Sequence, residues 1–162
     1  KLSRIFTPVI TTTNTLTMKT KINFTAFGVQ FKNIEAYNAP EANRTTHLTG
    51  RGQSAMVKQY VKALYGCSCQ VSTDFYSMGS SVDVWLDPRD IYADHVKAAK
   101  LDFRGSFQSG SFNGMEDIYE YDNNSVEKNL GIDFQFKFAT LKIGAKYGTK
   151  KYEELEELGL SN

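Results

Sequence analysis

The pattern of hydrophobic and polar positions along the chain predicts a helix before its midpoint. Apolar residues recur at helical spacing between Gln53 and Tyr65, where one face of the segment carries Met56, Val57, Tyr60, Val61 and Leu64. Gly66 follows directly, and glycine is the residue that most often ends a helix. We therefore expect a helix over residues 53–65 with its apolar face against the core.

Two alternating segments follow and predict a β-hairpin. The first alternation is carried by Cys69, Val71, Thr73 and Phe75, and the second by Val82, Val84 and Leu86. The short segment from Ser77 to Ser80 contains a glycine and joins the two. This order favours antiparallel pairing, with the apolar residues on one face and Trp85 on the other.

Asp87 marks the predicted start of a second helix. It suits the N-cap, Pro88 suits the first helical position, and Asp90 lies near the positive end of the helix dipole. One face of this helix carries Tyr92, Val96, Ala99 and Phe103. Residues 105–114 are small and rich in glycine, which predicts a flexible loop. The strand predicted after it runs from Met115 to Tyr121.

Further strands are expected on either side of this region. Residues 27–31 alternate and predict a strand, and a loop is predicted over residues 35–50. Residues 132–138 and 141–147 alternate cleanly, which predicts two strands that pair with each other around Ala139 and Thr140. A short peripheral helix is expected from Lys150 to Leu158.

These elements together predict an α+β fold. It consists of an antiparallel sheet with a central β-hairpin, two main packing helices and a short C-terminal helix. Residues 21–162 are expected to form a single domain. Residues 1–20 are expected to be an N-terminal arm or leader, because Met18 is a plausible natural start.

The composition excludes several function classes. Of the 162 residues, 41% are hydrophobic and 23% are charged, which is typical of a folded globular domain. The formal net charge of +1 is too small for a mimic of duplex DNA, and a dedicated duplex binder usually has a clearly basic balance. The chain has no apolar run long enough to cross a membrane, so no membrane association is expected.

Candidate catalytic and metal-binding residues do not form a recognisable set. Cys67 and Cys69 are two residues apart, which is poor geometry for a disulfide, so we interpret them as reduced thiols. A small enzyme using Glu116, Asp117 and His95 is the least favoured hypothesis, because successive strand residues point to opposite faces. We predict no catalytic residue, no metal and no cofactor.

A basic strip leads onto the first predicted helix. It consists of Arg44, Arg51, Lys58 and Lys62. Such a strip, with tyrosines nearby, would suit the phosphate backbone of a nucleic acid. An ordinary solvated helix face is the alternative interpretation of the same residues.

Aromatic residues make up 13% of the chain and gather around the predicted hairpin and the glycine-rich segment. We predict a partner-binding surface there, made of Tyr76, Met78, Trp85, Phe107, Phe112, Asn113, Met115, Tyr119 and Tyr121. A second apolar face on the hairpin must be covered either by the protein's own helices or by a partner. The sequence leaves both alternatives open.

Two ordered motifs in this region resemble a known family. Residues 71–84 and 110–121, together with Phe107, resemble the twenty-ninth family of large polyvalent protein-associated domains. The resemblance covers about residues 53–122. Such domains occur in multi-domain proteins of phages and conjugative elements.

The resemblance implies a phage or mobile-element accessory protein and provides no catalytic residues. It implies a place in the bacterial host cytoplasm or the virion, and counter-defence is one role that it allows. We therefore expect a protein that binds a protein partner from host or phage. Nucleic-acid binding and a virion-associated or assembly role are the alternatives.

Overall fold

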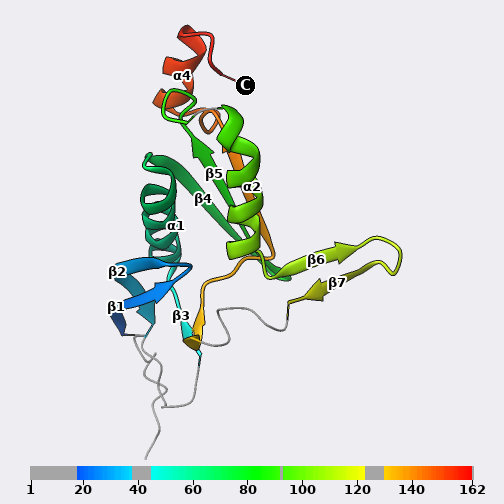
Figure 1. The fold of residues 1–162 in the computed structure, drawn as a ribbon. Coiled ribbons are helices and arrows are strands. Elements are labelled where there is room, and N and C mark those ends of the chain that lie inside the picture. The colour runs from blue at the N-terminus through cyan, green and yellow to red at the C-terminus, as the bar shows by residue number, and fades with distance from the viewer. Residues whose placement is uncertain (1–17, 38–44, 92, 123–129, 162) are drawn as a thin grey trace, which may run out of the picture.

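A three-stranded sheet with two helices packed against one face forms the body of the protein (Figure 1). The computed structural model describes residues 18–37, 45–91, 93–122 and 130–161. The strand order is β4 (Cys69–Tyr76), β5 (Gly79–Leu86) and β9 (Phe138–Ile143), and the two helices are α1 (Gly50–Tyr65) and α2 (Ala93–Phe107). The predicted α+β class, the central antiparallel hairpin and the two main helices are confirmed.

α1 begins earlier than the periodic pattern predicts. Thr49 caps it, because its Oγ1 accepts a hydrogen bond from the Gly52 N–H at 3.0 Å. Two glycines in the first turn hide this start in the sequence, since glycine disfavours a helix. Gly52 is nevertheless required, because a Cβ there would lie 1.9 Å from the Glu35 carbonyl oxygen. The predicted end at Gly66 is confirmed, with a φ of 68°.

The interface between α1 and α2 is centred on Tyr60. Its ring lies 6.2 Å from that of Phe103 and 4.9 Å from that of Phe107. Its hydroxyl lies 2.9 Å from Ser106 Oγ, so the buried polar group has a partner. Phe27, from the N-terminal hairpin, also packs against Tyr60 at 6.0 Å. These rings join two helices and a hairpin in one core.

An N-terminal hairpin, β1 (Lys19–Ala26) and β2 (Val29–Tyr37), packs against α1. The strand predicted over residues 27–31 is wrong in its first part, because Phe27 and Gly28 form the turn of this hairpin with positive φ. The loop predicted over residues 35–50 contains β3 (Thr46–His47), which pairs in parallel with β8 (Ile132–Asp133). Residues 1–17, most of the predicted N-terminal segment or leader, lie outside the described residues.

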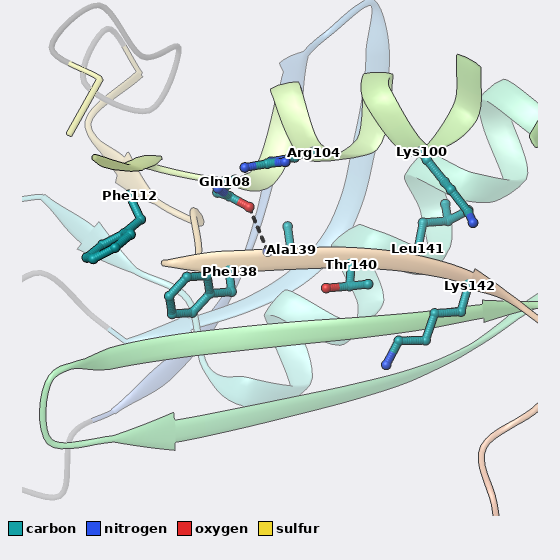
Figure 2. A pocket seen from close by; sticks show the side chains of 9 residues that line it. All are labelled: Lys100, Arg104, Gln108, Phe112, Phe138, Ala139, Thr140, Leu141 and Lys142. Atoms are coloured by element: carbon teal, nitrogen blue, oxygen red, sulfur yellow. Dashed lines mark hydrogen bonds between the residues drawn. The ribbon is translucent and has the colours of Figure 1, made fainter. Parts of the chain in front are cut away.

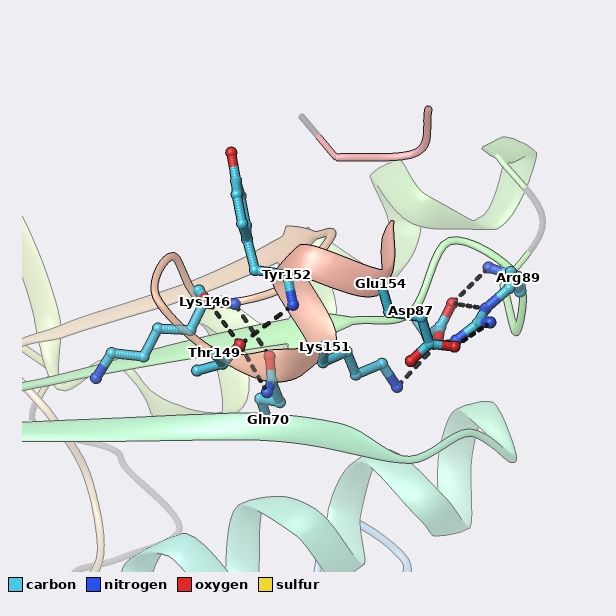
Figure 3. A network of polar contacts seen from close by, with 8 residues as sticks. All are labelled: Gln70, Asp87, Arg89, Lys146, Thr149, Lys151, Tyr152 and Glu154. Atoms are coloured by element: carbon cyan, nitrogen blue, oxygen red, sulfur yellow. Dashed lines mark hydrogen bonds and ion pairs between the residues drawn. The ribbon is translucent and has the colours of Figure 1, made fainter. Parts of the chain in front are cut away.

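Asp87 does not start α2, which begins only at Ala93, so the predicted helix start is wrong. The Asp87 carboxylate instead accepts the Arg89 N–H at 2.9 Å and pairs with Lys151 Nζ at 2.8 Å (Figure 3). The Asp90 N–H donates to the Asp87 carbonyl oxygen at 3.0 Å and closes a turn. The hydrogen bond from the Arg89 side chain is the largest influence on Asp87 and holds the pKa of its carboxyl well below the usual range.

The same network fixes the short C-terminal helix α4 (Lys150–Glu157), which confirms the predicted element. Arg89 Nη1 donates to Glu154 Oε1 at 2.9 Å, and Leu155 is buried beneath the helix. α4 therefore caps the end of the sheet at which β5 finishes (Figure 1).

Of the described helices, none is long and apolar enough to cross a membrane.

The loop predicted over residues 105–114 is wrong, because α2 includes residues 105–107 and a second hairpin, β6 (Gly110–Asn113) and β7 (Ile118–Tyr121), begins at Gly110. Residues 114–117 form its turn, which shortens the strand predicted on its C-terminal side. The hairpin projects from the body of the protein (Figure 1). We call residues 110–121 the arm.

β9 is one continuous strand, so the prediction of two strands meeting around Ala139 and Thr140 is wrong. Neither residue favours a turn, and both lie inside β9, which pairs in parallel with β5. The preceding Phe134 and Phe136 are buried in the core. β9 is therefore the outer strand of the sheet, and no strand among the described residues pairs with its outer edge.

Candidate partner-binding surface and basic groove

The arm carries strongly exposed apolar side chains. Met115 is 98% exposed at its turn, while Phe112 and Tyr121 are 57% and 61% exposed on its strands. A two-stranded hairpin has little stability of its own in water, and exposed apolar patches mark interaction sites. The arm is therefore a part of the molecule that gains stability from being covered.

Tyr119 anchors the arm at its base. Its hydroxyl donates to the Lys137 carbonyl oxygen at 2.6 Å, and its ring lies 6.0 Å from that of Phe138. The Lys137 ammonium lies 5.2 Å from the centre of the Tyr119 ring, within the range of a cation–π interaction. Tyr119 is half-buried, and its contacts position the arm on the body of the protein.

Asn113 shapes the turn of the arm. Its side-chain amide donates to Glu120 Oε1 at 2.8 Å, and its Oδ1 accepts the Met115 N–H at 3.1 Å. The two bonds are local and together define the path of the chain around the turn. They hold Met115 at the exposed tip of the arm.

The turn between β4 and β5 lies beside the base of the arm. Tyr76 and Met78 are exposed there, and a Cβ on Gly79 would come within 2.9 Å of the Lys137 side chain. Because Lys137 also lies over Tyr119, the structure brings the β4–β5 turn and the arm together. Five of the predicted partner-binding residues are exposed in this area, and we call them the apolar surface: Tyr76, Met78, Phe112, Met115 and Tyr121.

Phe107 and Trp85 do not belong to the apolar surface. Phe107 is 0% exposed and lies 5.0 Å from Phe103, because α2 extends through it, so its assignment as a partner-binding residue is wrong. Trp85 is half-buried on the face of the sheet opposite the two helices, where Lys142 Nζ lies 5.2 Å from its ring. Along β5, Trp85 lies roughly 20 Å from Gly79, at the opposite end of the strand.

A groove of about 470 Å³ runs between α2 and β9 beside the arm (Figure 2). Lys100 and Arg104 line it from α2, and neither forms an ion pair with any residue that the structure describes. Lys142 lines it from β9 and pairs with Asp83 at 2.8 Å. The other lining residues are uncharged: Gln108, Phe112, Phe138, Ala139, Thr140 and Leu141. We call this feature the basic groove.

The basic groove has only a partial signal in the sequence. Lys100 and Arg104 are four residues apart, so a predicted helix already places them on one side. Lys142 joins them only through the parallel pairing of β9 with β5. Local patterns do not reveal that long-range pairing, so sequence reasoning did not find the groove.

The basic strip predicted for nucleic-acid binding is partly described. Arg44 lies outside the described residues, whereas Arg51, Lys58 and Lys62 are exposed on α1. Their helical spacing places these three cations along one side of α1. Lys62 Nζ also donates to the Gly66 carbonyl oxygen at 3.2 Å and so helps to cap the helix. Nucleic-acid binding by this strip stays a prediction.

The residues of the enzyme hypothesis lie apart. Glu116 and Asp117 are exposed in the turn of the arm, whereas His95 lines a separate groove with Leu64 and Tyr65 between α1 and α2. Within the described part of the chain, no group of three or more His, Cys, Asp or Glu could hold a metal ion. The structure therefore assembles no catalytic site from these residues.

Cys67 and Cys69 are free cysteines, as the interpretation of reduced thiols requires. Cys67 is buried, and burial raises the pKa of Cys69 to about 11. A thiol with so high a pKa is almost fully protonated at neutral pH and is a poor nucleophile. The two cysteines therefore act as packing residues.

The candidate site is defined by two neighbouring surface features. Its two parts are the apolar surface, on the arm and the β4–β5 turn, and the basic groove beside the arm. Residues 71–84 and 110–121, on which the family expectation rests, fall in β4, β5 and the arm. Comparison of the chain with models of protein families, with curated proteins and with solved structures found no match.

Proposed function

We propose that this protein is a phage or mobile-element accessory protein that acts by binding a protein partner through the apolar surface. The observation that carries the proposal is the exposure of Phe112, Met115 and Tyr121 on a projecting hairpin. The resemblance of residues 53–122 supports the phage or mobile-element context and allows counter-defence as the role. The residues that carry the resemblance lie on the same hairpins that expose the apolar side chains.

The energetics favour a protein partner for this surface. Complete burial of one large apolar side chain contributes roughly 1.5–3 kcal/mol, and aromatic residues are common among the side chains that dominate interfaces. Before binding, Tyr119 holds the arm against the body through Lys137, and Asn113 fixes the turn of the arm through Glu120. A positioned arm loses less conformational entropy on binding than a flexible loop would.

Affinity capture from host cells with variant proteins tests the proposal. Phe112→Ser and Tyr121→Ser together remove two exposed rings of the arm and should reduce capture of the partner to background. Tyr147→Ser is the matched control, because Tyr147 is equally aromatic and strongly exposed but lies after the end of β9, near α4. Mass spectrometry of the captured proteins then identifies the partner.

Unchanged capture by the double variant would reject the apolar surface as the binding site. Thermal unfolding of all variants shows whether lost capture follows from lost folding. Capture of capsid or tail proteins would favour the virion or assembly role, whereas a bacterial host protein would favour counter-defence.

Nucleic-acid binding is the second candidate function. Its specific support is the line of Arg51, Lys58 and Lys62 on the exposed side of α1. Binding of single- and double-stranded oligonucleotides should then weaken steeply as salt rises and should be lost in Arg51→Glu with Lys58→Glu. Weak binding that does not change with salt would remove this candidate.

A further inference from the structure

The outer edge of β9 offers unpaired backbone groups along the basic groove. In a parallel pair, alternate residues direct their N–H and C=O groups toward the neighbouring strand. The Gly144 N–H donates to the Leu86 carbonyl oxygen at 2.8 Å, so the even-numbered residues of this segment face β5. Ala139, Leu141 and Ile143 therefore direct their backbone groups to the outer edge, where a further strand could pair.

Gln108 closes one end of this edge. Its Oε1 accepts the Ala139 N–H at 3.3 Å (Figure 2). Its Nε2 donates to the Gly110 carbonyl oxygen at 2.7 Å. The side chain thus occupies the position at which the backbone of another strand would pair with Ala139. The backbone of Leu141 and Ile143 is the part of the edge that remains available.

The charges along the groove select the chemistry of an occupant. Lys100 and Arg104 have no ion-pair partner among the described residues, and Lys142 has one, Asp83. No residue that lines the groove is acidic. Asp102, from the same helix, lies in the separate groove between α1 and α2, away from these cations. The potential in the basic groove is therefore positive and complements an acidic segment.

Aromatic side chains flank the end of the groove nearest the arm. Phe112 comes from β6 and Phe138 from β9, and both are exposed (Figure 2). The groove volume of about 470 Å³ has room for several side chains. Strand addition characteristically combines backbone hydrogen bonds with such pockets for alternate side chains.

We propose that the basic groove binds an extended acidic segment of the partner protein, which adds as a strand to the outer edge of β9. This inference rests on the proposed function and specifies the chemistry of the partner. The backbone of Leu141 and Ile143 pairs with the segment, while Lys100 and Arg104 bind its carboxylates. A single-stranded nucleic acid would match the cations and rings but has no backbone amides for the strand edge, so the open edge favours a peptide.

Selection of random short peptides on the purified chain tests the inference. The selected peptides should be acidic, should lack proline in the segment that binds, and should bind more weakly as salt rises. Arg104→Glu and Lys100→Glu should each weaken a selected peptide by about tenfold or more. Lys21→Glu is the matched control, because it makes the same charge change at an exposed residue of β1 that does not line the groove.

Two further variants separate strand addition from charge attraction alone. N-methylation of alternate peptide residues should abolish binding in one register and leave it intact in the other, because only one set of amides faces β9. A peptide with its acidic residues changed to lysine should bind Arg104→Glu more tightly than it binds the unmodified protein. Binding that tolerates methylation at every position overturns the strand model.

The remaining outcomes also decide the question. Failure to select an acidic peptide overturns the inference. The inference is also overturned if no peptide binds but a thymidine oligonucleotide binds the unmodified protein and does not bind Arg104→Glu.

Met115→Ser distinguishes the inference from the proposed function, because Met115 lies at the arm tip and does not line the groove. If Met115→Ser or Tyr121→Ser loses partner capture while no peptide is selected, the proposed function stands and the acidic strand fails. If peptides bind as expected while arm variants capture normally, the apolar surface fails as the partner site.

Discussion

The side chain of Gln108 hydrogen-bonds the backbone N–H of Ala139 at 3.3 Å and so joins the end of α2 to the outer strand of the sheet. The same side chain donates to the Gly110 carbonyl oxygen at the start of the arm. This side chain thereby links the end of α2, the edge of β9 and the start of the arm. The two candidate binding features meet at this side chain.

Gln108→Ala should loosen this junction without unfolding the protein. Loss of the two hydrogen bonds should reduce the free energy of unfolding by about 1 kcal/mol and raise amide hydrogen exchange at Ala139. Gln30→Ala is the control, because Gln30 is exposed on β2 and should change neither quantity. Exchange at Ala139 that equals that of the unmodified protein would show that the hydrogen bond does not protect this amide.

The buried pair Tyr60 and Ser106 gives a second prediction. Tyr60→Phe and Ser106→Ala should each destabilise the protein by about 1 kcal/mol, because each leaves the other hydroxyl buried without its partner. The double variant should cost less than the sum of the two, since it removes both polar groups. Urea unfolding of the four proteins measures this coupling, and strict additivity would contradict a direct hydrogen bond.

Local patterns predicted the elements that local interactions determine. The helical spacing from Met56 to Leu64 and the alternation across Val82 and Val84 reflect burial against the nearest neighbours, and both elements are present. Thr49 escaped prediction because the glycines that follow it are poor helix formers. Gly52 is there for a long-range reason, namely the close approach of Glu35 in β2.

Long-range contacts account for the predictions that failed. Asp87 has the sequence context of an N-cap, but Lys151, far along the chain, and Arg89 occupy its carboxylate. The alternating residues around Ala139 favour a strand. That they form one strand, parallel to β5, follows from long-range pairing with β5 and not from the local pattern. The apolar arm could be predicted in part, while the basic groove required Lys142 to be brought beside α2.

The Asp87 network should make stability depend on pH in the acidic range. Asp87 is 3% exposed, and its bonds to Arg89 and Lys151 lower the pKa of its carboxyl below that of the unfolded chain. A group with a lowered folded-state pKa stabilises above its unfolded pKa and loses this contribution as pH falls through the folded-state value. Stability from Asp87 should therefore be complete at neutral pH and decline below about pH 4.

Asp87→Asn measures that contribution directly. At neutral pH it should reduce the free energy of unfolding by about 2 kcal/mol, because hydrogen bonds to a charged acceptor are lost or weakened. The difference between Asp87→Asn and the unmodified protein should shrink as pH falls below about 4. Asp74→Asn is the matched control, since Asp74 is exposed on β4 and forms no ion pair with a described residue. A difference that stays constant down to the lowest accessible pH would contradict the role of the Asp87 charge.

Two glycines in the main helices should respond to the same substitution in opposite directions. Gly52→Ala places a Cβ 1.9 Å from the Glu35 carbonyl oxygen, so β2 or α1 must move and stability should fall by about 2 kcal/mol. Gly105→Ala meets no atom within 4 Å inside α2 and should raise stability by roughly 0.5–1 kcal/mol, because alanine restricts the unfolded chain and favours a helix. Thermal and urea unfolding of both variants measure the two signs. Equal changes at the two positions would mean that helix propensity alone decides them and that β2 does not lie against Gly52.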